Sequence, residues 1–169
     1  MLRTLQVLFL SICLLGGVAV AEEQCASTVT EAWDAITQPP NGHYLLQQST
    51  QEDPKDCLKG EVPTGQNKPK ANVKMTYKDS NGQWQTNEWE FYMAGPNITA
   101  SLDSRTLSGT VIFGIKGKCH VTQYSGGGYG LWTHSSLSGS DGGCCESKFG
   151  EQTKGETPKK PQEKDCSTK

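Results

Sequence analysis

The sequence predicts an all-β domain closed into an antiparallel barrel, with one short helix before the strands and another after them. Two observations favour this fold class. About eight short segments of strand character follow one another between positions 43 and 136, separated by turn residues. None of the segments between them is a helix long enough to connect parallel strands. A closed barrel also leaves no unpaired sheet edge, which favours it over the alternative, an open sandwich.

The first elements are a helix and two strands. A short helix is expected over residues 30–36, where Thr30 is the predicted N-cap and apolar residues recur at helical spacing. The Pro-Pro-Asn-Gly run at 39–42 ends it. The first two strands are expected at 43–49 and 58–62.

The middle of the chain predicts a hairpin. Apolar and polar residues alternate from 73 to 78 and again from 89 to 93, the period of two typical of a strand with one buried face. Between these runs, Asp-Ser-Asn-Gly at 79–82 supplies a tight turn, because Asn and Gly tolerate positive φ. Further strands are expected at 97–103, 107–115, 118–125 and 129–136.

The last part of the chain predicts a helix and a tail. Residues 144–153, with Phe149 as the main apolar side chain, are expected to form a short helix outside the barrel. The stretch from about 154 to 169 is rich in Pro, Lys and Glu and is expected to be irregular, held near its end by Cys166.

The N-terminus has the features of a signal peptide. Arg3 precedes an apolar run from 5 to 20, and small residues stand at 19–21. A membrane anchor is the alternative, although the run is short for a span. We therefore expect residues 1–21 to be removed and residues 22–169 to form one secreted, extracellular domain.

Charge and motifs exclude several classes of function. The chain has 16 basic and 18 acidic residues, a net charge of −2, which offers no footprint for nucleic acid or an anionic membrane. The three histidines are scattered, and the glycine-rich run at 126–130 opens no helix as a phosphate loop would. We expect no enzyme activity and no cofactor.

Six of the seven cysteines lie beyond the predicted signal peptide, an even number that indicates three disulfides in an oxidising compartment. Spacing alone does not choose among the pairings. A zinc site is the alternative, but no Cys-x-x-Cys or His-x-His spacing occurs, so we expect no metal. The sequon at Asn97 predicts a glycan on a secreted surface. The six cysteines are Cys25, Cys57, Cys119, Cys144, Cys145 and Cys166.

The barrel interior allows two interpretations. An eight-stranded barrel can be filled by side chains or can hold one small ligand. On composition alone a packed core is the better interpretation of the apolar set. That set consists of Val73, Met75, Tyr77, Trp89, Phe91 and Trp132.

Several segments, in order along nearly the whole chain, resemble the salivary lipocalins of soft ticks (argasids). The runs at 56–61, 73–78 and 84–91 carry the resemblance, together with Cys-His-Val at 119–121, Leu-Trp at 131–132, the paired cysteines at 144–145 and Lys-Asp-Cys at 164–166. Residues 131–136 are similar to the argasid allergen branch and residues 56–61 to the moubatin branch.

The resemblance implies an eight-stranded lipocalin barrel with a ligand pocket. It also implies that the protein sequesters host inflammatory or haemostatic mediators at the bite, evading host defence without converting them. The pocket interpretation then overtakes the packed core. The implied disulfides are Cys25–Cys144, Cys57–Cys166 and Cys119–Cys145.

Two ligand classes divide the family. Amine binders, which bind histamine and serotonin, resemble one another in having an acidic residue directly after the third mature cysteine and another directly before the Leu-Trp pair. Here His120 and Gly130 hold those positions, and a buried ammonium without carboxylates would be costly. An amine binder would need other carboxylates, such as Glu31, Asp34 or Asp103.

The lipid binders share the histidine at His120 and a basic position at Lys55, and we expect both to meet a lipid carboxylate at the barrel mouth. This sequence lacks a second basic residue that the lipid-binding branch has. It also has Thr122 at the position where that branch has an acidic residue. Our main hypothesis is an eicosanoid scavenger, for leukotrienes or thromboxane A2. Its expected ligand-binding residues are Tyr44, Lys55, Leu58, Val73, Met75, Tyr77, Trp89, Phe91, His120 and Trp132.

A third hypothesis, from another class of function, is that the protein is an inhibitor that binds a host plasma protein, such as a complement component, through exposed loops. The resemblance implies that related lipocalins both bind small molecules and inhibit such proteins. Otherwise we expect a monomer whose partner is a small-molecule mediator, with no nucleic acid and no membrane partner.

Overall fold

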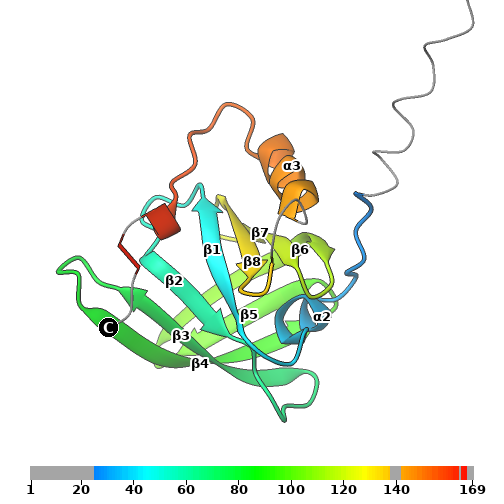
Figure 1. Cartoon of the computed structure of the whole chain (residues 1–169). Helices are drawn as coiled ribbons and strands as arrows, with labels where there is room; N and C mark the ends of the chain where they lie inside the picture. Colours follow the sequence, from blue (N-terminus) through cyan, green and yellow to red (C-terminus); the bar gives the residue numbers. More distant parts are fainter. Residues whose placement is uncertain (1–24, 138–141, 164, 167–169) are drawn as a thin grey trace, which may run out of the picture.

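Eight strands form a closed antiparallel barrel in the computed structural model, which describes residues 25–137, 142–163, 165 and 166. Each strand pairs with the next, and β8 pairs with β1 (Figure 1). The predicted all-β barrel with a short N-terminal helix and a C-terminal helix is confirmed, and the open sandwich is wrong. The strands are β1 (His43–Ser49), β2 (Asp56–Glu61), β3 (Lys70–Lys78), β4 (Trp84–Ala94), β5 (Asn97–Leu102), β6 (Arg105–Ile115), β7 (Cys119–Tyr124) and β8 (Tyr129–His134).

The β3–β4 hairpin is longer than the sequence predicted. Its pairing begins at Lys70, opposite Tyr92, and ends at Lys78, opposite Trp84. In the turn, the Asp79 carboxylate accepts hydrogen bonds of 2.9 Å from the backbone N–H groups of Asn81 and Gln83. The local alternation therefore located the strands, while their ends were set by the partner strand.

Helix α2 (Ala32–Thr37) closes one end of the barrel. Its side chains Ala32, Ala35 and Ile36 are buried in one cluster with residues of β3 to β6. The predicted Thr30 cap is wrong: Glu31 is the N-cap residue and makes no side-chain cap. The Ala32 N–H instead donates to the Gly95 carbonyl, 2.8 Å away in the β4–β5 turn, so contact with the barrel satisfies this donor.

Helix α3 (Gly143–Gln152) packs outside the barrel beside β7 and β8, as Figure 1 shows. Phe149 and Cys145 are buried there with Phe113, Val121 and Leu131. The helix expected at 144–153 with Phe149 as its apolar contact is therefore confirmed.

Three disulfides brace the barrel. The bonds are Cys25–Cys144, Cys57–Cys166 and Cys119–Cys145, the pairings that the resemblance implied. The neighbouring Cys144 and Cys145 tie the first turn of α3 to the N-terminal segment and to β7. Three such bonds are consistent with an oxidising, extracellular compartment.

The tail is more ordered than expected. Lys159 pairs with Ser49 through two backbone hydrogen bonds of 2.9 and 2.8 Å, beside the bulge of β1. The 3-10 turn η2 (Pro161–Glu163) then lies on β1 and β2, where the Gln162 side chain donates to the Leu58 carbonyl at 3.0 Å. Backbone pairing with β1 thus attaches the tail before Cys166 is reached.

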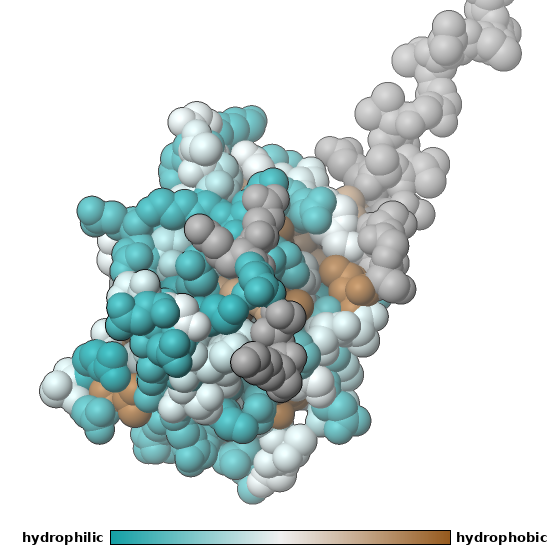
Figure 2. Space-filling view, turned by 60° about the vertical axis from the view of Figure 1, so that its left-hand side comes forward, coloured by the Kyte–Doolittle hydropathy of each residue, from teal (hydrophilic) through white to brown (hydrophobic). Residues whose placement is uncertain are grey.

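The surface in Figure 2 is mostly hydrophilic, with small hydrophobic patches. Among the described residues, Tyr92 and Leu107 are the large apolar side chains that remain exposed. No helix of the described part of the chain is long and apolar enough to cross a membrane. The predicted signal peptide, residues 1–21, lies outside the described residues.

Removing the Cys57–Cys166 bond should destabilise the protein and free its tail. The bond closes a loop with a sequence separation of 109, and the chain-entropy model assigns such a loop about 4 to 5 kcal/mol. The double variant Cys57→Ala, Cys166→Ala should lose about this much free energy of unfolding in urea. Limited proteolysis should then cut the tail first.

The matched control is Cys25→Ala with Cys144→Ala, whose sequence separation is 119. It should lose similar stability while the tail stays protected. Equal tail protection in both double variants would contradict the prediction.

Candidate ligand-binding cavity

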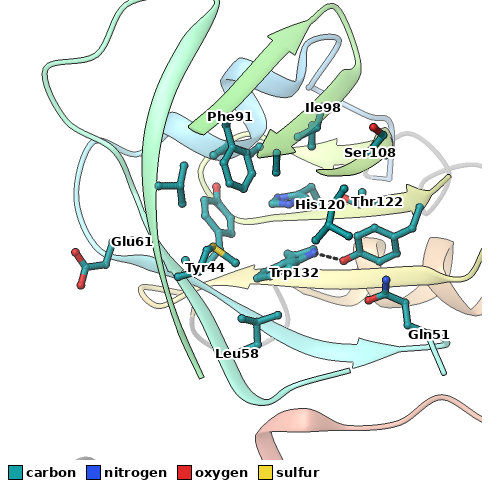
Figure 3. A pocket seen from close by; sticks show the side chains of 18 residues that line it. Tyr44, Gln51, Leu58, Glu61, Phe91, Ile98, Ser108, His120, Thr122 and Trp132 are labelled. Atoms are coloured by element: carbon teal, nitrogen blue, oxygen red, sulfur yellow. Dashed lines mark hydrogen bonds between the residues drawn. The ribbon is translucent and has the colours of Figure 1, made fainter. Parts of the chain in front are cut away.

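The barrel encloses a cavity of about 160 Å³ (Figure 3). Apolar side chains from opposite walls, among them Ile36, Val73, Phe91 and Ile98, line most of it. The packed core favoured by composition is confirmed in part, because Val73, Met75 and Phe91 belong to a hydrophobic cluster and also line the cavity. Seven of the predicted ligand-binding residues line the cavity, and their role in binding stays a prediction: Tyr44, Leu58, Val73, Met75, Phe91, His120 and Trp132.

Two other predicted residues, Tyr77 and Trp89, are not part of the cavity lining. Tyr77 lies near the β3–β4 turn, and its hydroxyl accepts a hydrogen bond of 3.3 Å from the Asn87 side chain. The Trp89 ring lies under the guanidinium of Arg105, 5.5 Å from the ring centre.

The prediction that Lys55 and His120 both lie at the barrel mouth is wrong, because the two residues lie toward opposite ends of the barrel. Lys55 is half exposed in the loop before β2 and pairs with Asp53 at 2.9 Å. His120 follows Cys119 at the start of β7 and pairs with Gly114 near the end that α2 closes. Lys55 is not among the lining residues.

His120 is a buried, neutral side chain. It is 4% exposed, and its Nδ1 has no hydrogen-bond partner. Tyr44 meets the imidazole edge-on at 4.9 Å, and Trp132 stacks on it at 6.2 Å. Burial lowers the pKa of His120 to about 3. The imidazole is therefore not a cation at neutral pH, and its contact with a lipid carboxylate stays a prediction.

Tyr124 is a cavity residue that the sequence did not reveal. Its hydroxyl accepts a hydrogen bond of 3.0 Å from Trp132 Nε1, and burial raises its pKa to about 12. Gly130 on the neighbouring strand β8 makes room for the ring, because a Cβ at this position would overlap the Tyr124 hydroxyl. Glycine inside a strand marks such close approach and was the available signal.

The cavity wall has little charge. Glu61 is the lining residue with a carboxylate; it points away from the cavity in Figure 3 and pairs with Lys74 at 3.1 Å. Of the other carboxylates considered for an amine, Glu31 pairs with Lys68, Asp34 lies 4.0 Å from Lys116 and Asp103 occupies the β5–β6 turn. None of the three lines the cavity.

The end of the barrel opposite α2 provides the opening. Leu107 lines the cavity there and is 57% exposed. Gln51, in the β1–β2 loop, lines the cavity from the same end. Among the described residues, no group of three His, Cys, Asp or Glu side chains is placed to hold a metal ion.

The chain is similar to known proteins in sequence and in structure. No family model matches it. It is 36% identical over 155 residues to moubatin from Ornithodoros moubata, covering 89% of this chain and 90% of moubatin. The crystal structure of the AM182 serotonin complex is 26% identical, with a TM-score of 0.68, covering 81% of this chain and 92% of that one.

The free energy of unfolding should decrease as the pH is lowered, because folding keeps His120 from accepting a proton. The pKa is 6.5 for the ordinary imidazole and about 3 in the folded protein. Below pH 6.5 the unfolded state therefore binds a proton that the folded state does not, and stability is lost as the pH falls toward 3. This group contributes a loss of about 2 kcal/mol between pH 7 and pH 5.

Urea unfolding of the wild type and of His120→Gln at both pH values measures this slope. The variant should lose less stability than the wild type on acidification, whatever its stability at pH 7. His43→Gln is the control, because burial lowers the pKa of this less buried histidine too but its effect should be smaller. Equal slopes for His120→Gln and the wild type would contradict the prediction.

Gly130→Ala should destabilise the protein through Tyr124. The added methyl displaces the phenol and leaves the Trp132 N–H without its acceptor, at a cost of about 1 to 3 kcal/mol. In a double-mutant cycle in urea, the effect of Gly130→Ala should shrink in a Tyr124→Ala background. Gly126→Ala, whose Cβ would meet no atom within 4 Å, is the control and should change little. Additive effects would show that the two residues are not coupled.

Proposed function

From the premise that this chain belongs to the soft-tick lipocalins, we propose that it sequesters a fatty-acid-derived host mediator, of the leukotriene or thromboxane class, at one molecule per chain. Membership of this family supports the binding of small mediators. The protein acts by holding the ligand. Because each chain binds one molecule, the amount of mediator removed at the bite is limited by the amount of protein present.

The observation that carries the proposal is the largely apolar wall of the cavity, in which the carboxylate of Glu61 points away from the interior. Each methylene buried against side chains such as Val73, Phe91 and Ile98 contributes about 0.8 kcal/mol. A buried ammonium would lack a carboxylate among the inward-pointing side chains, a cost of several kcal/mol. The wall therefore favours a hydrocarbon chain over an amine.

Neutral polar groups inside the barrel support an oxygenated lipid. His120 Nδ1 is buried without a partner, and a ligand hydroxyl would supply one. Leaving a buried polar atom unpaired costs about 1 to 3 kcal/mol, so its satisfaction favours ligands with such a group. The hydroxyl of Tyr124, held by Trp132, is a further neutral partner.

The size of the cavity sets where the ligand lies. About 160 Å³ is close to the ~150 Å³ of an apolar cavity that holds benzene. The interior as it stands thus takes part of a twenty-carbon chain. The remainder would run past Leu107 to the open end, where this exposed apolar side chain offers contact.

A biogenic amine is the second candidate. The similar crystal structure contains serotonin, and the cavity volume suits a single ring system. An amine would bind here if the Glu61 carboxylate left Lys74 and turned inward. The plasma-protein alternative stays a prediction of the family resemblance.

The same premise supports secretion. We propose that residues 1–21 are removed and that Asn97 carries a glycan. Asn97 is exposed at the start of β5, where its side-chain oxygen accepts a hydrogen bond of 2.9 Å from Thr110. Its amide nitrogen remains available for the sugar. The three disulfides fit the same route through the secretory pathway.

Filling the cavity should abolish lipid binding. Ala100 is buried on the inner face of β5 and lines the cavity, so Ala100→Phe occupies ligand space. Calorimetric titration of the wild type with leukotriene B4 should give one site per chain. Ala100→Phe should weaken binding about tenfold or more, which is ~1.4 kcal/mol. Ser101→Phe adds the same ring to the outer face and should bind as the wild type does.

Titration with serotonin separates the two candidates. Serotonin binding without any eicosanoid binding would refute the lipid proposal. Loss of that serotonin binding in Glu61→Gln would then identify the amine site.

A further inference from the structure

We propose that Arg105 and Trp89 form a headgroup site at the open end of the barrel, which binds the carboxylate of a long-chain acid. The inference rests on the proposed lipid-binding function and names the residue that selects an acid over an uncharged lipid. Neither residue belongs to the cavity lining.

The strand register places Arg105 on the inner face of the barrel. Leu107 pairs with Ala100, which pairs with Phe91, and all three line the cavity. Alternate residues of a strand face the same side. Arg105, two residues before Leu107, therefore continues the same inner face toward the opening.

Trp89 stands on the same face of β4, two residues before Phe91. Between the two strands lies Leu102 of β5, which pairs with Arg105. The guanidinium lies 5.5 Å from the Trp89 ring centre, so it reaches across β5 on the inside of the barrel. An independent contact thus agrees with the register.

The charge of Arg105 is left for a ligand. Lysines such as Lys55, Lys70 and Lys74 already pair with carboxylates at 2.9 to 3.1 Å. Within the part of the chain that the structure describes, no carboxylate lies within 4.0 Å of Arg105 in an ion pair. Stacking on an aromatic ring leaves the N–H groups at the edge of the guanidinium to hold a carboxylate at two points.

The distance between this site and His120 selects the length of the ligand. Arg105 and Gly114, the partner of His120, are separated by about 30 Å of β6 at ~3.3 Å per residue. The usual tilt of barrel strands, about 35 to 45°, shortens this to roughly 20 to 25 Å along the barrel axis. A ligand that touches both sites must be a long chain with an acid at one end, whereas a single ring system reaches one site.

The test compares an acid with its uncharged ester. Arachidonic acid and methyl arachidonate are titrated by calorimetry into the wild-type protein, Arg105→Gln, Arg105→Lys and the control Lys70→Gln, whose lysine pairs with Glu90 outside the cavity lining. The wild type and Lys70→Gln should prefer the acid by about tenfold. Arg105→Gln should lose the preference while it binds the ester as before, and Arg105→Lys should keep part of it.

Unchanged ester binding by Arg105→Gln also shows that the variant is folded. Equal binding of acid and ester by the wild type, or an undiminished preference in Arg105→Gln, would overturn the headgroup site and leave the proposed function standing. If the wild type binds leukotriene B4 but neither of these compounds, the headgroup site is overturned and the proposed function stands. If it binds none of the three, both proposals fail.

Discussion

Pairing of β8 with β1 is the constraint on which the rest of the structure depends. It closes the sheet, so that every second side chain of each strand must point into a common interior. One end of that interior is sealed by α2, whose Ile36 reaches the cavity. Because the interior is incompletely filled, the closed sheet becomes a container, and the residues at its open end decide what is admitted.

The sequence predicted the elements of this fold better than their ends. Strand β1 spans the residues expected from its pattern, and α3 lies within one residue of its expected ends. Strands β2 and β3 begin earlier than predicted, at Asp56 and Lys70. In β3 the alternation continues through Lys70, Ala71 and Asn72, and the small buried side chain of Ala71 is the signal that the prediction missed. The Thr30 cap failed for a different reason, since a carbonyl distant in sequence satisfies the Ala32 N–H.

The cavity was predicted less completely than the fold. Apolar alternation identified Val73, Met75 and Phe91, because inward direction follows from local spacing. The charge of His120 could not be predicted from local spacing, because its neutrality results from burial by residues of other strands. The inward direction of Arg105 could have been predicted, because it lies two residues before Leu107 on the same strand. Its environment could not, because the contact with Trp89 joins two strands that are separated by β5.

The distribution of cysteines leaves one run of neighbouring strands without a crosslink. Disulfides anchor β2, β7, α3 and the tail, whereas β3 to β6 contain no cysteine. The crosslinked strand β7 carries His120, and the strands without a crosslink carry Phe91 and Leu107. A guest wider than the resting cavity would therefore be accommodated by outward bowing of β3 to β6, while the side that orients its polar groups keeps its shape.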